Sequence, residues 1–132
     1  MNKEEQLSVD EQQTWVQDQY QVATKYAAEH GIVTDSVQVE ESRYLVPLLV
    51  LWKITAIDGK KYWILCGDLP SDYSPIAVAK NAREAIKHFS LKWQMQAENL
   101  LKIGDTEQNK YAQLLIGRAD GLYKLQSDES LW

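Results

Sequence analysis

The sequence predicts an α+β fold, in which one helix precedes an antiparallel hairpin and two long helices follow it. Three patterns lead to this class: a capped amphipathic segment near the N-terminus, two β-rich runs around Asp58-Gly59, and helical periodicity through the C-terminal part. With 132 residues, the chain is expected to form a single domain, residues 1–132, with its own hydrophobic core. Residues 32–46 contain either a third strand, since Val37–Glu40 alternates, or a loop.

The first helix is predicted to span residues 9–30. Ser8 and Glu11 form an S-x-x-E capping box, in which the serine oxygen accepts from a helical N–H and the glutamate reaches back to the cap. Apolar residues recur after it at helical spacing, and Gly31 suits a left-handed stop.

Two β-rich runs, Pro47–Ile57 and Lys60–Gly67, are predicted to form a hairpin. Asp58-Gly59 alone separates them, and this pair is the strongest short signal for a two-residue type I′ turn. Such a turn pairs residues whose numbers sum to 117. Both faces of the hairpin are then mainly apolar, so helices, a third strand or another subunit must cover the second face.

The C-terminal part is predicted to be a pair of long helices. Ser74-Pro75 is typical of a helix start, with serine as the cap and proline in the first turn. We therefore expect one helix over residues 76–103, which Gly104 ends, and another over residues 106–126 that folds back against it.

Composition and charge restrict the function classes. The net charge is −5, and residues 1–42 hold nine acids against two bases, which argues against a general nucleic-acid binder. No apolar run is long enough to span a membrane, and the polar N-terminus is not a signal peptide. The single cysteine cannot form an internal disulfide. We expect a cytoplasmic protein that binds no membrane, no metal and no cofactor.

The strand exit YWILCGDLPSDY contains the candidate catalytic residues. Cys66 could be a nucleophile if His88 lowered its pKa and if Asp68 or Asp72 oriented the pair. However, His88 lies off the main apolar stripe of its helix, and free cysteines usually pack in cores. We interpret the two aspartates as turn and cap residues just before a helix N-terminus, where carboxylates are favourable.

A second set of candidates follows one predicted helix and suggests binding rather than catalysis. Lys80, Arg83 and Lys87 lie along one side, where they either contact an anion or acidic partner or form a solvated face. Leu91 and Met95 form a second apolar stripe, which is typical of a helix covered on two sides. Its cover is either another helix of the chain or a second copy in a dimer.

Three segments carry a resemblance to a known family: SRYLVPLLVLWKI, DGKKYWILCGDLPSDY and AKNAREAIKHFSLKWQMQAENL. Together they resemble a small family of uncharacterised proteins of about this length from marine gamma-proteobacteria, classed as a domain of unknown function. The resemblance covers most of the chain and rests on packing and turn residues. It implies a bacterial cytosolic protein and supplies no activity, cofactor or site residue.

The leading hypothesis from the sequence is a non-enzymatic binding or adaptor protein that forms a homodimer and has an acidic surface. Its partner is another protein or a second copy. The alternative is a small enzyme or small-molecule binder with its site at the strand exit, Cys66–Asp72, using Tyr73 or Arg83 in addition. A third hypothesis is a structural subunit of a larger assembly.

Overall fold

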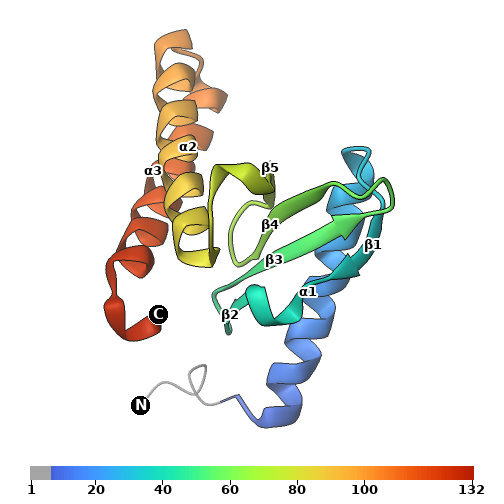
Figure 1. The fold of residues 1–132 in the computed structure, drawn as a ribbon. Helices are drawn as coiled ribbons and strands as arrows, with labels where there is room; N and C mark the ends of the chain where they lie inside the picture. Colours follow the sequence, from blue (N-terminus) through green and yellow to red (C-terminus); the bar gives the residue numbers. More distant parts are fainter. Residues whose placement is uncertain (1–6) are drawn as a thin grey trace. The chain divides into compact units, whose positions relative to one another are not determined.

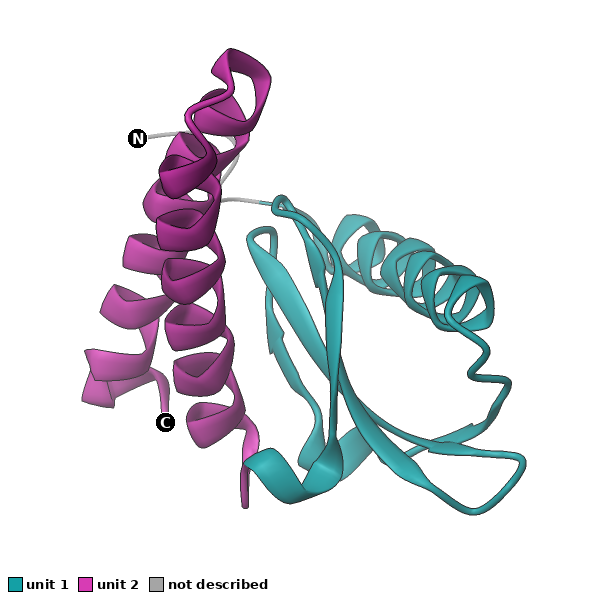
Figure 2. Cartoon of the chain, turned by 90° about the horizontal axis from the view of Figure 1, so that it is seen from above, with its two compact units in different colours: residues 1–78 teal, residues 79–132 magenta. Residues whose placement is uncertain are grey.

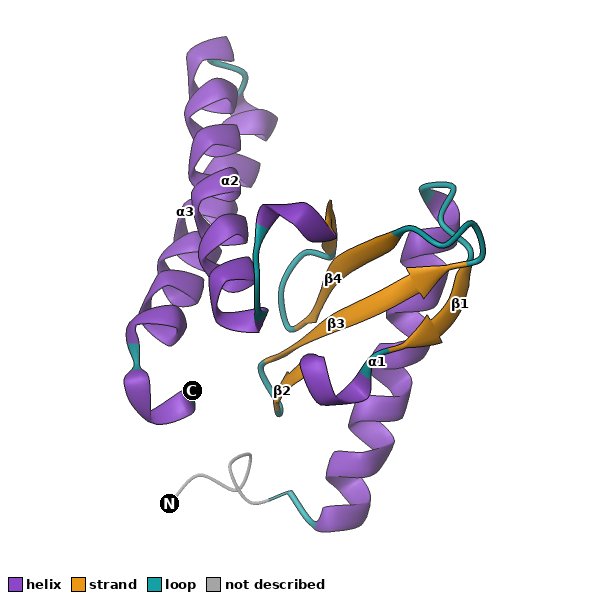
Figure 3. Cartoon of the chain, viewed as in Figure 1, coloured by secondary structure: helices purple, strands orange, loops and turns teal. Residues whose placement is uncertain are grey.

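A computed structural model describes residues 7–132 of the chain, and these form two compact units (Figure 2). The first runs to Val78 and contains one helix and an antiparallel sheet, and the second, Ala79–Trp132, contains two long helices (Figure 3). The α+β class and the order of its parts are thus confirmed. That the whole chain is one domain stays a prediction. The start of the polar N-terminal stretch, residues 1–6, lies outside the described residues.

Helix α1, Val9–Glu29, begins and ends where local hydrogen bonds dictate. The Glu11 N–H donates to the Ser8 hydroxyl oxygen at 3.1 Å, and the Ser8 N–H donates to the Glu11 carboxylate at 3.5 Å. Gly31 follows the helix with a φ of 79°, which suits a residue without a side chain. The predicted capping box and stop are both confirmed.

The sheet of the first unit has five antiparallel strands (Figure 1). They are β1 (Thr34–Val37), β2 (Arg43–Leu45), β3 (Leu49–Ala56), β4 (Lys61–Gly67) and β5 (Asp72–Pro75). Their order is β1-β3-β4-β5, and β2 also pairs with β3. A 3₁₀ turn, η2 (Val39–Glu41), separates β1 from β2. The alternative of a strand within residues 32–46 is therefore confirmed, in two short pieces.

The predicted register of the β3–β4 hairpin is wrong by one residue. Val50 pairs with Cys66, so paired residue numbers sum to 116. The loop has three residues, Ile57–Gly59, because the Gly59 N–H donates to the Ala56 carbonyl and Gly59 adopts a φ of 87°. A turn followed by a left-handed glycine is the usual three-residue hairpin loop. The shift gives each residue a different cross-strand partner.

Helix α1 packs on one face of the sheet, where the alternating side chains of β3 and β4 form a core (Figure 1). The Trp52 ring belongs to this core and contacts Tyr20 of α1 and Tyr44 of β2 edge-on, at 5.2 and 5.3 Å between ring centroids. The buried members are Ala23, Ala27, Ile32, Val50, Trp52, Ile54, Ala56, Ile64 and Cys66. Because this core contains Cys66 of β4 and Ala23 and Ala27 of α1, it packs the C-terminal end of β4 against the helix.

The predicted helix start at Ser74-Pro75 is wrong, because these residues end β5. Helix α2, Ala82–Ile103, begins instead at Asn81, whose side chain accepts a hydrogen bond from the Glu84 N–H at 2.9 Å. Proline lacks an N–H and is tolerated in an edge strand such as β5, so Ser-Pro fits both structures.

Helix α3, Thr106–Ser127, lies antiparallel beside α2 (Figure 1), and this confirms the predicted pair. Gly104 ends α2 with a φ of 77°, and the Asp105 side chain caps α3 by accepting from the Glu107 N–H. Inside the pair, the buried Ser90 hydroxyl donates to the Ala119 carbonyl at 2.8 Å. This bond satisfies a polar group that would otherwise be costly to bury.

Candidate functional site

Cys66 lies at the end of β4, and its side chain is fully buried in the core between the sheet and α1. Its thiol donates to the main-chain carbonyl oxygen of Gln19, with 3.5 Å between sulfur and oxygen. Burial raises the pKa of Cys66 to about 11, although the Trp52 side chain acts in the opposite direction. At neutral pH the residue is therefore a protonated thiol, which is a poor nucleophile.

The chain leaves the sheet at Gly67, next to the turn that precedes β3. The Asp68 N–H donates to the Leu48 carbonyl at 2.9 Å, which ties the exit to that turn. The Asp68 side chain is exposed, whereas the Asp72 carboxylate accepts from the Tyr73 N–H at 2.8 Å. A hollow of about 570 Å³ opens here, lined by Leu7, Trp15, Gln19, Pro47, Gly67 and Asp68.

Tyr73 belongs to a cluster of rings at the C-terminal end of α1. Its ring centroid lies 5.2 Å from that of His30 and 6.3 Å from that of Tyr62. His30 also packs against Tyr26 at 4.3 Å, and its Nδ1 lies 2.9 Å from the Tyr26 carbonyl oxygen. These contacts join α1 to β4 and β5, so Tyr73 has a packing role there.

The predicted basic side of α2 is partly used within the second unit. The Arg83 Nε–H donates to the Gln126 carbonyl oxygen at 2.8 Å, near the C-terminal end of α3. A cation is favourable at this end of a helix, because the last carbonyls lack helical partners. Lys80 and Lys87 are exposed, and His88 is half-buried. His88 belongs to the second unit, whereas the other catalytic candidates belong to the first.

The second apolar stripe of α2 is exposed. Leu91 retains 49% of its accessible surface and Met95 retains 66%, which are large values for side chains of this kind. The two residues are four apart, so their side chains lie next to each other on the helix. The sequence predicted that another helix of the chain or a second copy covers this stripe, and in the single chain both side chains are exposed.

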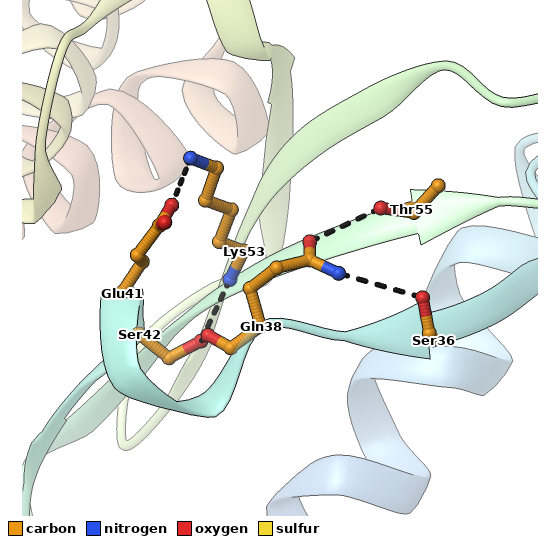
Figure 4. Close-up of polar contacts among 6 residues, drawn as sticks. All are labelled: Ser36, Gln38, Glu41, Ser42, Lys53 and Thr55. Carbon is orange, nitrogen blue, oxygen red and sulfur yellow. Dashed lines mark hydrogen bonds and ion pairs between the residues drawn. The ribbon is translucent and has the colours of Figure 1, made fainter.

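A hydrogen-bond network holds η2 on the edge of β3 (Figure 4). The Gln38 N–H donates to the Lys53 carbonyl at 2.8 Å, and the Lys53 N–H donates to the Ser42 hydroxyl at 2.9 Å. The Thr55 hydroxyl donates to the Gln38 side chain at 3.2 Å. The ion pair of Lys53 with Glu41 lowers the pKa of that carboxyl, first through the hydrogen bond and then through the charge.

A groove between α1 and β2 was not predicted from the sequence. It consists of two joined hollows of about 920 and 440 Å³ that share Val16, Gln17 and Tyr44. Burial raises the pKa of Tyr44, so its hydroxyl stays neutral. The helix side of this α1–β2 groove is formed by Val9, Gln12, Gln13, Val16 and Gln17. The four-residue spacing of Gln13 and Gln17 is the signal that could have indicated a polar helix edge.

Within residues 7–132, no group of three or more His, Cys, Asp or Glu side chains is placed to hold a metal ion. Over the same residues, no helix is both long enough and apolar enough to cross a membrane.

Residues 9–132 match the family described as Domain of unknown function (DUF4826), and the chain belongs to this family. This confirms the resemblance to an uncharacterised domain family. Searches of curated proteins and of solved structures gave no match to the chain.

Proposed function

We propose that this family member is a non-enzymatic binding or adaptor protein that forms a homodimer and presents an acidic surface to its partners. The observation that carries the proposal is the exposed pair Leu91 and Met95 on α2. Neighbouring exposed apolar side chains are typical of an interaction surface. The acidic character comes from the first unit, where residues 7–42 carry seven acidic side chains and one basic side chain.

The state of Cys66 supports a non-enzymatic role. The thiol is buried and protonated at neutral pH, and its hydrogen bond goes to a main-chain carbonyl rather than to a base. Nucleophilic catalysis needs an accessible thiolate or an adjacent base that removes the proton. A cytoplasmic location is part of the same proposal, because the single cysteine has no partner for an internal disulfide.

The second candidate function is a small-molecule binder at the strand exit. The hollow beside Pro47 and Gly67 favours it, since Asp68 places a carboxylate at the wall. Isothermal titration of a library of small amines against the wild type and Asp68→Asn tests this candidate. Binding that the substitution abolishes would support it, whereas no binding by the wild type would argue against it.

Light scattering coupled to size-exclusion chromatography tests the proposed homodimer. We expect a mass near twice the 15.2 kDa of one chain for the wild type. The variant Leu91→Ser/Met95→Ser should be monomeric, because it removes the exposed apolar pair. The matched control Ile57→Ser changes a residue that is 68% exposed in the hairpin loop and should remain dimeric. A wild type that is monomeric at every concentration would contradict the proposal.

A further inference from the structure

The exposed face of α2 carries charges as well as the pair Leu91 and Met95. Its residues recur at intervals of three and four, so they form one stripe along the helix, on the side opposite the buried Trp93. We call this the α2 stripe, and its members are Glu84, His88, Leu91, Met95, Glu98 and Lys102. All are exposed except His88, which is half-buried.

When the α2 stripe is read in the opposite direction, apolar residues fall on apolar positions and the charged residues at its two ends fall on positions of opposite charge. Counting outward from Trp93, Leu91 and Met95 are equally distant, and so are Glu84 and Lys102. When two identical helices pack antiparallel about a two-fold axis near Trp93, Leu91 of one copy faces Met95 of the other. Glu84 then faces Lys102 at both ends of the contact, so opposite charges flank an apolar centre.

The remaining charged position follows the same rule. His88 and Glu98 are also equally distant from the centre, so an imidazole faces a carboxylate. In a parallel arrangement, Glu84 would face Glu84 and Lys102 would face Lys102, and like charges would repel. The charges therefore favour one direction of packing over the other.

We propose that two copies of this chain associate through the α2 stripe, antiparallel and centred near Trp93, with Glu84 of each copy paired to Lys102 of the other. This rests on the proposed homodimer and specifies its interface. A two-fold contact of this kind uses the same surface on both copies and closes after two subunits. We therefore assign a second copy of this chain as the occupant of the α2 stripe, because an identical antiparallel helix matches it at every position.

A charge-swap experiment tests the interface. Glu84 and Lys102 are 18 residues apart, which is about 27 Å along one helix, so they do not interact within a single chain. Lys102→Glu places two like-charge contacts in each dimer and should weaken the dimer about tenfold. The double variant Glu84→Lys/Lys102→Glu restores opposite charges across the interface and should return the dissociation constant to near the wild-type value.

Analytical ultracentrifugation measures the dissociation constants, and circular dichroism confirms that each variant is helical. Lys110→Glu on α3 is the matched control, since it makes the same change of net charge outside the α2 stripe and should leave the dimer intact. If the wild type dimerises and Glu84→Lys/Lys102→Glu associates no more tightly than Lys102→Glu, the α2 interface is wrong and the homodimer stands. If the wild type does not dimerise, the interface and the proposed homodimer both fail.

Discussion

Replacing Gly67 by alanine should destabilise the first unit more than any other single methyl addition at a glycine. Gly67 has a φ of 136°, which side-chain-bearing residues rarely adopt. An alanine Cβ at this position would lie 2.6 Å from the Leu48 carbonyl oxygen and 2.6 Å from the Leu49 Cα. Both neighbours are main-chain atoms, so no side chain can rotate to relieve the overlap.

Two separate effects make up the expected loss. The unfavourable backbone conformation alone costs about 1–2 kcal/mol for a residue with a Cβ. Relieving the overlap requires the turn before β3 to move away, which breaks or stretches the Asp68-to-Leu48 hydrogen bond and adds about 1–2 kcal/mol. Gly67→Ala should therefore lower the free energy of unfolding by about 3 kcal/mol.

Urea denaturation followed by tryptophan fluorescence and far-ultraviolet circular dichroism measures this loss. Gly31→Ala is the matched control, because Gly31 has a φ of 79° but nothing lies within 4 Å of an added Cβ. The control carries the conformational effect alone and should lose about 1 kcal/mol. Equal losses in the two variants would refute the argument that main-chain crowding at the strand exit is what requires glycine.

Three further predictions concern the buried and bonded groups. Iodoacetamide should label Cys66 only on unfolding. Burial raises the pKa of the Cys66 thiol from 9.0 to about 11, so the thiol ionises at lower pH in the unfolded chain than in the folded one. As the pH rises from 9 to 11, the wild type should therefore lose about 2 kcal/mol of stability relative to Cys66→Ala. A stability difference between the two proteins that does not change with pH would contradict the burial of Cys66. Ser42→Ala leaves the Lys53 N–H without its partner and should cost about 1–3 kcal/mol in urea denaturation, and a loss near zero would mean that water replaces the hydroxyl. Arg83→Ala should lower the free energy of unfolding by about 1–2 kcal/mol, because it removes the hydrogen bond to the Gln126 carbonyl at the end of α3. Lys87→Ala, an exposed control on the same helix, should change this free energy by a few tenths of a kcal/mol at most. Equal effects of the two substitutions would exclude the hydrogen bond as the cause.

The helix ends could be predicted from the sequence because their chemistry is local. Ser8 and Glu11 cap α1 through hydrogen bonds that span three residues, and Asp105 caps α3 through a hydrogen bond that spans two. Gly31 and Gly104 end their helices with positive φ values, which glycine accepts without a steric penalty. Such signals depend on neighbours in the chain and are independent of how the units pack.

The features that were predicted wrongly depend on competing local solutions. Asp58-Gly59 fits a two-residue turn, but it also fits a three-residue loop with glycine last, and the pairing along β3 and β4 decides between them. Ser74-Pro75 fits a helix start or an edge strand equally well. Helix α2 begins after Asn81 because the Asn81 side chain caps the helix by accepting a hydrogen bond from the Glu84 N–H.

The candidate site could be predicted only in part, since burial and grooves arise from packing. The packing tendency of Cys66 followed from its residue type, and the core confirms that it is buried. Helical spacing also placed Leu91 and Met95 on a second stripe of α2, but it predicted a covered stripe, whereas both side chains are exposed. In contrast, β2 has three residues and is held by its pairing with β3, next to the hydrogen bond that the Lys53 N–H donates to the Ser42 hydroxyl. No local pattern specifies such a strand or the groove beside it.

The network around η2 has a consequence for the behaviour of the protein in concentrated solution. An open strand edge is a template on which further strands add, and this is a route to fibrous aggregates. In the described sheet, η2 divides one edge into two short strands, β1 with four residues and β2 with three. Between these strands, the Lys53 carbonyl accepts from the Gln38 N–H and the Lys53 N–H donates to the Ser42 hydroxyl, so both main-chain groups of Lys53 are bonded. The other edge, β5, has four residues and ends in Pro75, which has no N–H to donate. Neither edge offers a long run of unpaired groups, so the sheet resists growth from molecule to molecule while the helices are left free to associate.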